Sequence, residues 1–279
     1  MSDKDFSLAK SARPFSLVVA VVSCGLGIFM GLREMASPLL LVAAVLLAGL
    51  LLQVGVNLIN DKGDLKHIPR GGDQQRSRSQ ILFNYRLGLI SFGIAIGISL
   101  ALVVLRGWVL LAIGVVGVAG AFAYTTEPIN YKRRGMGVML VFWLMGVLMV
   151  EGAYLAVTGE LSWSVFWHSL PVSCLISLLL LSNEIRDYER DQHEGVATLT
   201  VRIGLAKARH LYWILIVTAF ALGGVYAVRG ELPDLYWLLL PLPLLWPMVH
   251  WLYADRRRSL PPWTGRFLLL FGIGYALAM

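Results

Sequence analysis

Long apolar runs follow one another along nearly the whole chain, and they limit its fold more than any other feature. A transmembrane helix needs about 20 predominantly apolar residues. Nine stretches come close to that length: 15–35, 38–60, 86–105, 108–126, 137–157, 164–183, 208–228, 235–253 and 264–279. Hydrophobic residues fill 57% of the 279 positions and the mean hydropathy is +0.70, which excludes an ordinary soluble core. The sequence predicts an all-α polytopic membrane protein with nine transmembrane helices in one bundle, a single domain over residues 1–279.

The basic residues lie in short clusters between the apolar runs. A net charge of +7 would favour nucleic acid only if these residues shared one exposed face, and their spacing does not allow that. With the loops assigned alternately to two sides, 21 of the 24 Lys and Arg fall on one side, and only Arg33, Arg106 and Arg229 on the other. Cytoplasmic loops carry the excess of Lys and Arg. We therefore expect an inner-membrane protein with a cytoplasmic N-terminus, Met279 outside, and no nucleic-acid partner.

The N-terminus and the cysteines add little to this scheme. Residues 1–14 are polar and lead into an apolar run of spanning length without a small-residue cleavage site, so we expect the first span to be retained. Cys24 and Cys174 lie inside apolar stretches without CxxC spacing. They are expected to be buried thiols.

Two connections on the cytoplasmic side are much longer than the others. They run from Asp61 to Tyr85 and from Asn183 to Ala206. Long polar connections at a membrane surface are frequently functional. These two also concentrate acidic residues: Asp61, Asp64 and Asp73 in the first, and Glu184, Asp187, Glu189, Asp191 and Glu194 in the second.

Each long connection begins with an oxygen-rich stripe. Asn57, Asn60, Asp61 and Asp64 are spaced i, i+3, i+4 and i+7, which places them on one helix face. In the second connection the spacing is i, i+4 and i+8, and the residues are Asn183, Asp187 and Asp191. The two stripes are expected at the same depth on the same side of the membrane.

Carboxylates crowded on one face favour a hard cation. Magnesium takes near-octahedral oxygen coordination, usually one or two carboxylates together with waters and substrate phosphates. Two facing stripes would each hold a magnesium ion, bridged by a diphosphate. Cations interleaved with the acids would bind the remaining phosphate oxygens: Lys62, Lys66, Arg70, Arg186 and Arg190. The alternative is a pair of solvated helix ends carrying ordinary i, i+4 ion pairs.

These stripes resemble the motifs of the UbiA superfamily of membrane prenyltransferases. The family carries an NDxxDxxxD-like motif after its second helix, matched here by Asn60, Asp61 and Asp64, with Asn57 one turn earlier. Its DxxxD motif after the sixth helix is matched by Asp187 and Asp191. The resemblance implies a nine-helix bundle that uses Mg²⁺ to transfer a prenyl group from a polyprenyl diphosphate. It assigns the metal and catalytic roles to these two motifs.

Three stretches are similar to the branch that prenylates 1,4-dihydroxy-2-naphthoate in menaquinone synthesis. They are residues 57–64, the YTTEP run at 124–128 with the GMG step at 135–137, and NEIRDYERDQHEG at 183–195 continued by TLTVRIG at 198–204. The resemblance thus implies an aromatic acceptor, with 4-hydroxybenzoate as the alternative ring. Apolar cavity linings leave little sequence signature, so prenyl length and oligomeric state are not specified.

The segment after the fourth predicted span also resembles the family. Its residues Tyr124, Thr125, Tyr131, Lys132 and Arg133 match the segment that holds the diphosphate and lines the cavity near the allylic carbon. An aromatic face stabilises a nearby cation, and a basic side chain neutralises a leaving group. The tyrosines would equally fit an interfacial aromatic belt, and the cations a positive-inside cluster.

The chain departs from the family pattern at two positions. The third acid of the first motif falls at Ile68, and the nearest acid, Asp73, lies five residues further on. The acid that often follows the GxG step of the naphthoate branch is replaced by Val138. The first departure leaves open whether Asp73 serves as a ligand, and the second bears on the acceptor.

The predicted chemistry needs no enzyme nucleophile. The C–O bond of the polyprenyl diphosphate ionises toward an allylic cation, and an electron-rich ring attacks that cation. Two other classes remain: a transporter, for which charges near the bilayer midplane would be typical, and an inactive relative that binds a partner. Glu151 lies inside the fifth predicted span. An acid within the membrane costs enough free energy to be a functional candidate, and the role of Glu151 stays unassigned.

Overall fold

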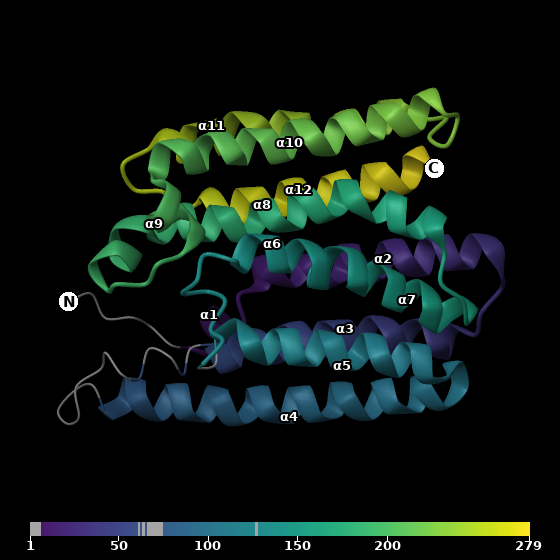
Figure 1. The fold of residues 1–279 in the computed structure, drawn as a ribbon, viewed down its shortest axis with the longest axis horizontal. Coiled ribbons are helices and arrows are strands. Elements are labelled where there is room, and N and C mark those ends of the chain that lie inside the picture. The colour runs from purple at the N-terminus through teal and green to yellow at the C-terminus, as the bar shows by residue number, and fades with distance from the viewer. Residues whose placement is uncertain (1–6, 61, 63–64, 66–74, 126–127) are drawn as a thin grey trace.

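The computed structural model describes residues 7–60, 62, 65, 75–125 and 128–279, and all regular structure in these ranges is helical (Figure 1). The elements are, in chain order, α1 (Leu8–Ser11), α2 (Pro14–Glu34), α3 (Leu39–Asn60), α4 (Gln75–Arg106), α5 (Trp108–Thr125), α6 (Gly137–Val141), η3 (Phe142–Leu148), α7 (Met149–Thr158), α8 (Trp163–His193), α9 (Leu199–Ile203), α10 (Leu205–Val228), η4 (Leu235–Leu239), η5 (Leu242–Leu244), α11 (Leu245–Tyr253) and α12 (Leu260–Ala278).

Every predicted span coincides with helical structure, and the multi-pass architecture is confirmed. Within the described residues, seven helical segments are long and apolar enough to cross a membrane. The other two predicted spans correspond to α5, a shorter apolar helix, and to α12, which contains Arg266 and two prolines in its first turns. The count of nine spans and the orientation of the termini remain predictions.

The predicted polar connections are shorter than the sequence suggested, because the flanking helices extend into them. α4 begins at Gln75, well before the predicted span at 86, and α8 continues to His193 rather than ending near 183. Hydropathy marks where a helix leaves the hydrocarbon, whereas the hydrogen-bond ladder continues wherever propensity permits. The 31 residues of α8 rise about 46 Å, longer than the roughly 30 Å hydrocarbon core.

The eighth predicted span, 235–253, is not one continuous α-helix. It consists of the 3₁₀ segments η4 and η5 followed by α11. Pro241 and Pro243 interrupt it, since proline lacks the backbone N–H that an α-helical turn requires. The packing core lies nearby, where buried side chains of α8, α10 and α12 meet α2.

The helices form two unequal parts joined by α2 and α7. In Figure 1, α8, α10, α11 and α12 lie on one side, and α3, α4 and α5 on the other. The first group is densely packed, and α8 contributes an almost continuous run of buried residues from Pro171 to Leu179. In contrast, α5 has no buried residue among those described. The cavity described below lies between this looser side and α8.

A π-helical segment, η3, interrupts the helix between α6 and α7. The wider turns of a π-helix disturb the regular hydrogen-bond ladder, and such segments are frequent at functional sites. Here the hydroxyl of Ser23 donates to the carbonyl of Met145 at 2.6 Å. The segment directs Leu144, Met145 and Leu148 toward the cavity.

Candidate active site

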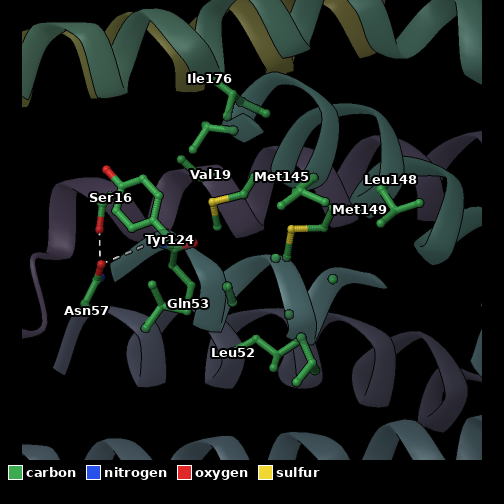
Figure 2. A pocket seen from close by; sticks show the side chains of 18 of the residues that line it. Ser16, Val19, Leu52, Gln53, Asn57, Tyr124, Met145, Leu148, Met149 and Ile176 are labelled. Carbon is green, nitrogen blue, oxygen red and sulfur yellow. Dashed lines mark hydrogen bonds between the residues drawn. The ribbon is translucent and has the colours of Figure 1, made fainter. Parts of the chain in front are cut away.

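A cavity of about 950 Å³ opens between the two parts of the bundle. Its walls come from α2, α3, α4, α5, the η3–α7 helix and α8. Ser16, Asn57 and Tyr124 gather at one end, and Leu52, Leu148 and Met149 lie along the remainder (Figure 2). The cavity therefore joins a polar end to a long apolar channel.

The second predicted stripe lies on this cavity. Asn183, Asp187 and Asp191 all line its polar end from α8. Asp187 forms a bidentate pair with Arg186, with N–O distances of 2.9 and 2.7 Å, and its Oδ2 lies 2.9 Å from Nη2 of Arg190. Nη2 of Arg190 also lies 3.4 Å from Asp191 Oδ1. Both carboxylates are held in position by cations of their own helix.

Part of the first stripe lines the same cavity from the opposite wall. Asn57 and Asn60, at the end of α3, are both lining residues. Asp61 and Asp64 lie outside the described residues, as do Ile68, Asp73, Lys66 and Arg70. The structure thus brings the amides of the first stripe and the acids of the second to one space, and the metal role of Asp61 and Asp64 stays a prediction.

The amide of Asn57 is already engaged by the N-terminal segment. Its Nδ2 donates to the carbonyl of Ala12 and to the hydroxyl of Ser16, both at 2.8 Å. Its Oδ1 faces Nε2 of Gln53 at 3.4 Å. With only 4% of its surface exposed, Asn57 fastens the start of α2 to α3, so this predicted metal ligand has a structural role.

Replacing Asn57 by Ala is therefore expected to lower the thermal midpoint in detergent even without metal. The half-buried carbonyl of Ala12 would lose this donor, and a hydrogen bond contributes about 0.5–1.5 kcal/mol to stability. The control is Asn60→Ala, which removes the same amide from a half-buried position on the same helix end. Equal midpoints for the two variants would contradict the structural role.

The predicted cations divide into two groups. Lys132 and Arg186 line the cavity, as does Arg190. Lys62 is exposed, lies outside the lining, and sits with its ammonium 3.8 Å from the ring centroid of Tyr85. Of the two predicted tyrosines, Tyr124 lines the cavity and Tyr131 does not.

Backbone hydrogen bonds hold the turn around Asn130 against the end of α5 and bring Lys132 to the site. The backbone N–H groups of Tyr131 and Lys132 return to the carbonyls of Ala123 and Tyr124, at 3.1 and 3.0 Å. Asn130 supplies the left-handed residue of this turn, with φ of 37°, a conformation that Asn tolerates. The turn therefore places the side chain of Lys132 beside the last turn of α5.

Arg202 connects the stretches that resemble the naphthoate branch. Its guanidinium donates to the carbonyls of Ala197 and Arg133, at 2.9 and 3.0 Å. Gly135, with φ of 72°, leaves room for this side chain, because a Cβ there would lie 2.5 Å from Cδ of Arg202. The GMG step and the TLTVRIG run thus pack against each other.

Sequence reasoning missed several lining residues. Lys10 and Arg13 line the polar end from the N-terminal segment, and Arg13 has a left-handed φ of 48° just before Pro14. Glu184 also lines the cavity and is 5% exposed. Its Oε2 accepts from the N–H and hydroxyl of Thr200, while its Oε1 has no hydrogen-bond partner in the described part of the chain. Of these residues, only Arg13 carried a local signal, because it directly precedes the proline that begins the first long helix.

Glu151 does not belong to this site. It lies on α7, it is 8% exposed, and it is not among the lining residues. The neighbouring cavity positions on α7 are Met149, Gly152 and Ala153.

The donor set fits magnesium that is shared with a phosphate-bearing substrate. Hard oxygen donors from Asp187 and Asp191 face amides across one cavity. Among the residues that the structure describes, no three His, Cys, Asp or Glu side chains form a cage for a metal ion. Magnesium does not require such a cage, since the ion usually takes one or two carboxylates and completes its shell with water and phosphate.

Comparison with known proteins identifies the family. The UbiA prenyltransferase family model matches residues 18–271. The chain belongs to the UbiA prenyltransferase family. The predicted resemblance is thereby confirmed, and the protein is a prenyltransferase.

Among relatives, the 1,4-dihydroxy-2-naphthoate octaprenyltransferase of Bacillus subtilis (strain 168) is 28% identical over 223 residues, covering 77% of this chain and 70% of its own length. Two solved UbiA homologues share the fold. The apo structure from Aeropyrum pernix K1 has a TM-score of 0.69 at 17% identity, covering 96% of this chain and 97% of its own. The homologue from Archaeoglobus fulgidus, bound to GPP and Mg²⁺, has a TM-score of 0.65 at 14% identity, covering 97% and 99%.

Proposed function

We propose that this UbiA-family enzyme transfers a polyprenyl group from a polyprenyl diphosphate to 1,4-dihydroxy-2-naphthoate in menaquinone biosynthesis. One observation carries the proposal: a single cavity joins an acidic and cationic end to an apolar channel. That is the shape and chemistry of an amphiphile with a diphosphate head and an isoprenoid tail. The naphthoate acceptor is supported by the Bacillus relative and by the three matching sequence stretches.

The apolar channel is long enough for several isoprene units. Cavity-lining residues of α5 extend from Leu110 to Tyr124, and fourteen residues of helix rise about 21 Å. Val45 and Asn57 mark a similar length of wall on α3. The tail would lie here, with the diphosphate between α3 and α8.

Residues at the polar end would hold magnesium and the diphosphate. Asp187 and Asp191, together with the predicted ligands of the first motif, would coordinate the ion. When bound, magnesium neutralises the charge that develops on the leaving group. Lys132, Arg186 and Arg190 would bind the phosphate oxygens that the metal leaves free.

Prenyl transfer then needs positioning more than covalent chemistry. The allylic C–O bond breaks and the diphosphate leaves with its electron pair. The ring of Tyr124 would stabilise the resulting cation through its negative face. The acceptor ring forms a new C–C bond to the allylic carbon, and in the naphthoate reaction the same ring carbon loses its carboxylate. Dry walls protect the cation from water.

The membrane orientation follows from the charge distribution. The proposed site lies at the ends of α3 and α8, beside the long acid-rich connections that the Lys and Arg bias assigns to the cytoplasm. We therefore propose a cytoplasm-facing site in the inner membrane.

Mass spectrometry of the reaction product tests this function. Purified protein, Mg²⁺ and a polyprenyl diphosphate are combined with either 1,4-dihydroxy-2-naphthoate or 4-hydroxybenzoate. We expect the naphthoate to gain the isoprenoid mass and lose CO₂, EDTA to abolish the product, and excess Mg²⁺ to restore it. Prenylation of 4-hydroxybenzoate alone would replace the acceptor, and no transfer to either ring would refute the proposal.

A further inference from the structure

Arg257 lies in a run of three arginines that the charge pattern explains only as an orientation signal. Arg256 and Arg258 are exposed, as that reading expects, but Arg257 is 5% exposed. An orientation signal needs positive charge near the membrane surface, and it gives no reason to bury one guanidinium among exposed ones. The buried member of the run therefore has another role.

The guanidinium of Arg257 contacts the polar end of α8 at two points. Its Nε donates to the carbonyl of Ile185 at 3.0 Å, and its Nη2 forms an ion pair with Glu189. Its Nη1 lies 3.4 Å from the carbonyl of Ala254, on its own loop. The connection between α11 and α12 is thereby fastened to α8.

These contacts lie on the face of α8 opposite Asp187 and Asp191. Ile185 and Glu189 are one turn apart on one face, and Asp187 and Asp191 are one turn apart on another. An offset of two residues corresponds to about 200° around the helix axis, so Arg257 holds the side opposite the carboxylates. Two contacts opposite a pair of ligands restrict the rotation of the helix that carries them, although the Glu189 side chain is itself 63% exposed.

We infer that Arg257 is a positioning residue for the metal and diphosphate site, acting through the rotational setting of α8. This inference rests on the proposed function, because it takes Asp187 and Asp191 as magnesium ligands. Contacts that orient metal ligands are worth roughly 10- to 100-fold in affinity or activity, and Arg257 would act on the two ligands through the helix that carries them.

The test measures metal binding directly, without turnover. Mn²⁺ replaces Mg²⁺, and the free ion is followed by electron paramagnetic resonance in the presence of inorganic pyrophosphate, with the same mixture without protein as the reference because pyrophosphate itself binds Mn²⁺. Arg257→Ala is compared with the wild type and with Arg258→Ala, which removes the same charge from an exposed neighbour. We expect Arg257→Ala to raise the half-saturating Mn²⁺ concentration about tenfold, and Arg258→Ala to leave it unchanged.

A conservative variant guards against simple unfolding. Arg257→Lys keeps a positive charge opposite Glu189 and loses the fork that also reaches Ile185. It should fold, melt close to the wild type, and bind Mn²⁺ with affinity between those of wild type and Arg257→Ala. If both variants are folded and bind Mn²⁺ as tightly as the wild type, the inference about Arg257 is wrong, and the proposed function is unaffected. A wild-type protein that binds no Mn²⁺ with pyrophosphate would overturn both this inference and the proposed function.

Discussion

Asp187→Ala is expected to reduce prenyl transfer by roughly a thousandfold or more, which corresponds to about 4 kcal/mol of lost transition-state stabilisation. Asp187 lines the polar end of the cavity and pairs with both Arg186 and Arg190. Removing its carboxylate would deprive the proposed metal site of a ligand and leave Arg186 without its bidentate partner, whereas Arg190 would keep Asp191. The measurement is product formation by purified protein at saturating Mg²⁺.

The fold should survive this change. Asp187 pairs with residues of its own helix, and pairs of this kind contribute little to stability. The control is Glu194→Ala, which removes a carboxylate from the end of the same helix at a position outside the cavity lining. Near-normal turnover by Asp187→Ala, or an equal loss in Glu194→Ala, would contradict the assignment.

Gly117→Trp is expected to impair transfer of long polyprenyl groups strongly while sparing short ones. Gly117 lines the apolar channel from α5, and a Cβ at this position would meet no atom within 4 Å. An indole would fill space that the tail needs. We expect kcat/KM to fall roughly 100-fold or more for an octaprenyl donor, about 3 kcal/mol, and only a few-fold for geranyl diphosphate.

The matched control is Gly97→Trp on α4. Gly97 also has open space around it, but it is exposed and does not line the channel. Both variants introduce the same side chain into an apolar helix, so a general effect of bulk would appear in both. Equal losses with the octaprenyl and geranyl donors in Gly117→Trp would argue against a tail in this channel.

The fold was predictable because hydropathy and charge bias are properties of long segments. Runs of about 20 apolar residues located every long helix but not the short α1 and α9, and the resemblance of 183–195 to a known motif identified the family. What hydropathy could not give was where helices end in water. The first turns of α4, which include Arg76 and Arg78, are polar and still helical, so the predicted boundary there was about three turns late.

The site was predictable where spacing along one helix decides the geometry. Asn183, Asp187 and Asp191 share a face because of helical periodicity alone, and the structure brings that face to the cavity. Contacts between distant segments follow no such rule. The hydrogen bond from Asn57 to Ala12 depends on how the bundle packs, and so do the cavity position of Lys10 and the burial of Arg257. The local sequence does not indicate these contacts.

The sparse packing of α5 has a consequence for how this enzyme holds its substrate. All described residues of α5 are at least partly exposed, so this helix contributes little to the core. Its cavity-lining face is available to a bound lipid. An isoprenoid tail in the channel would supply the missing contacts, so that the donor lipid completes the protein interior. When the prenylated product leaves, the enzyme would then lose some of the contacts that stabilise its fold.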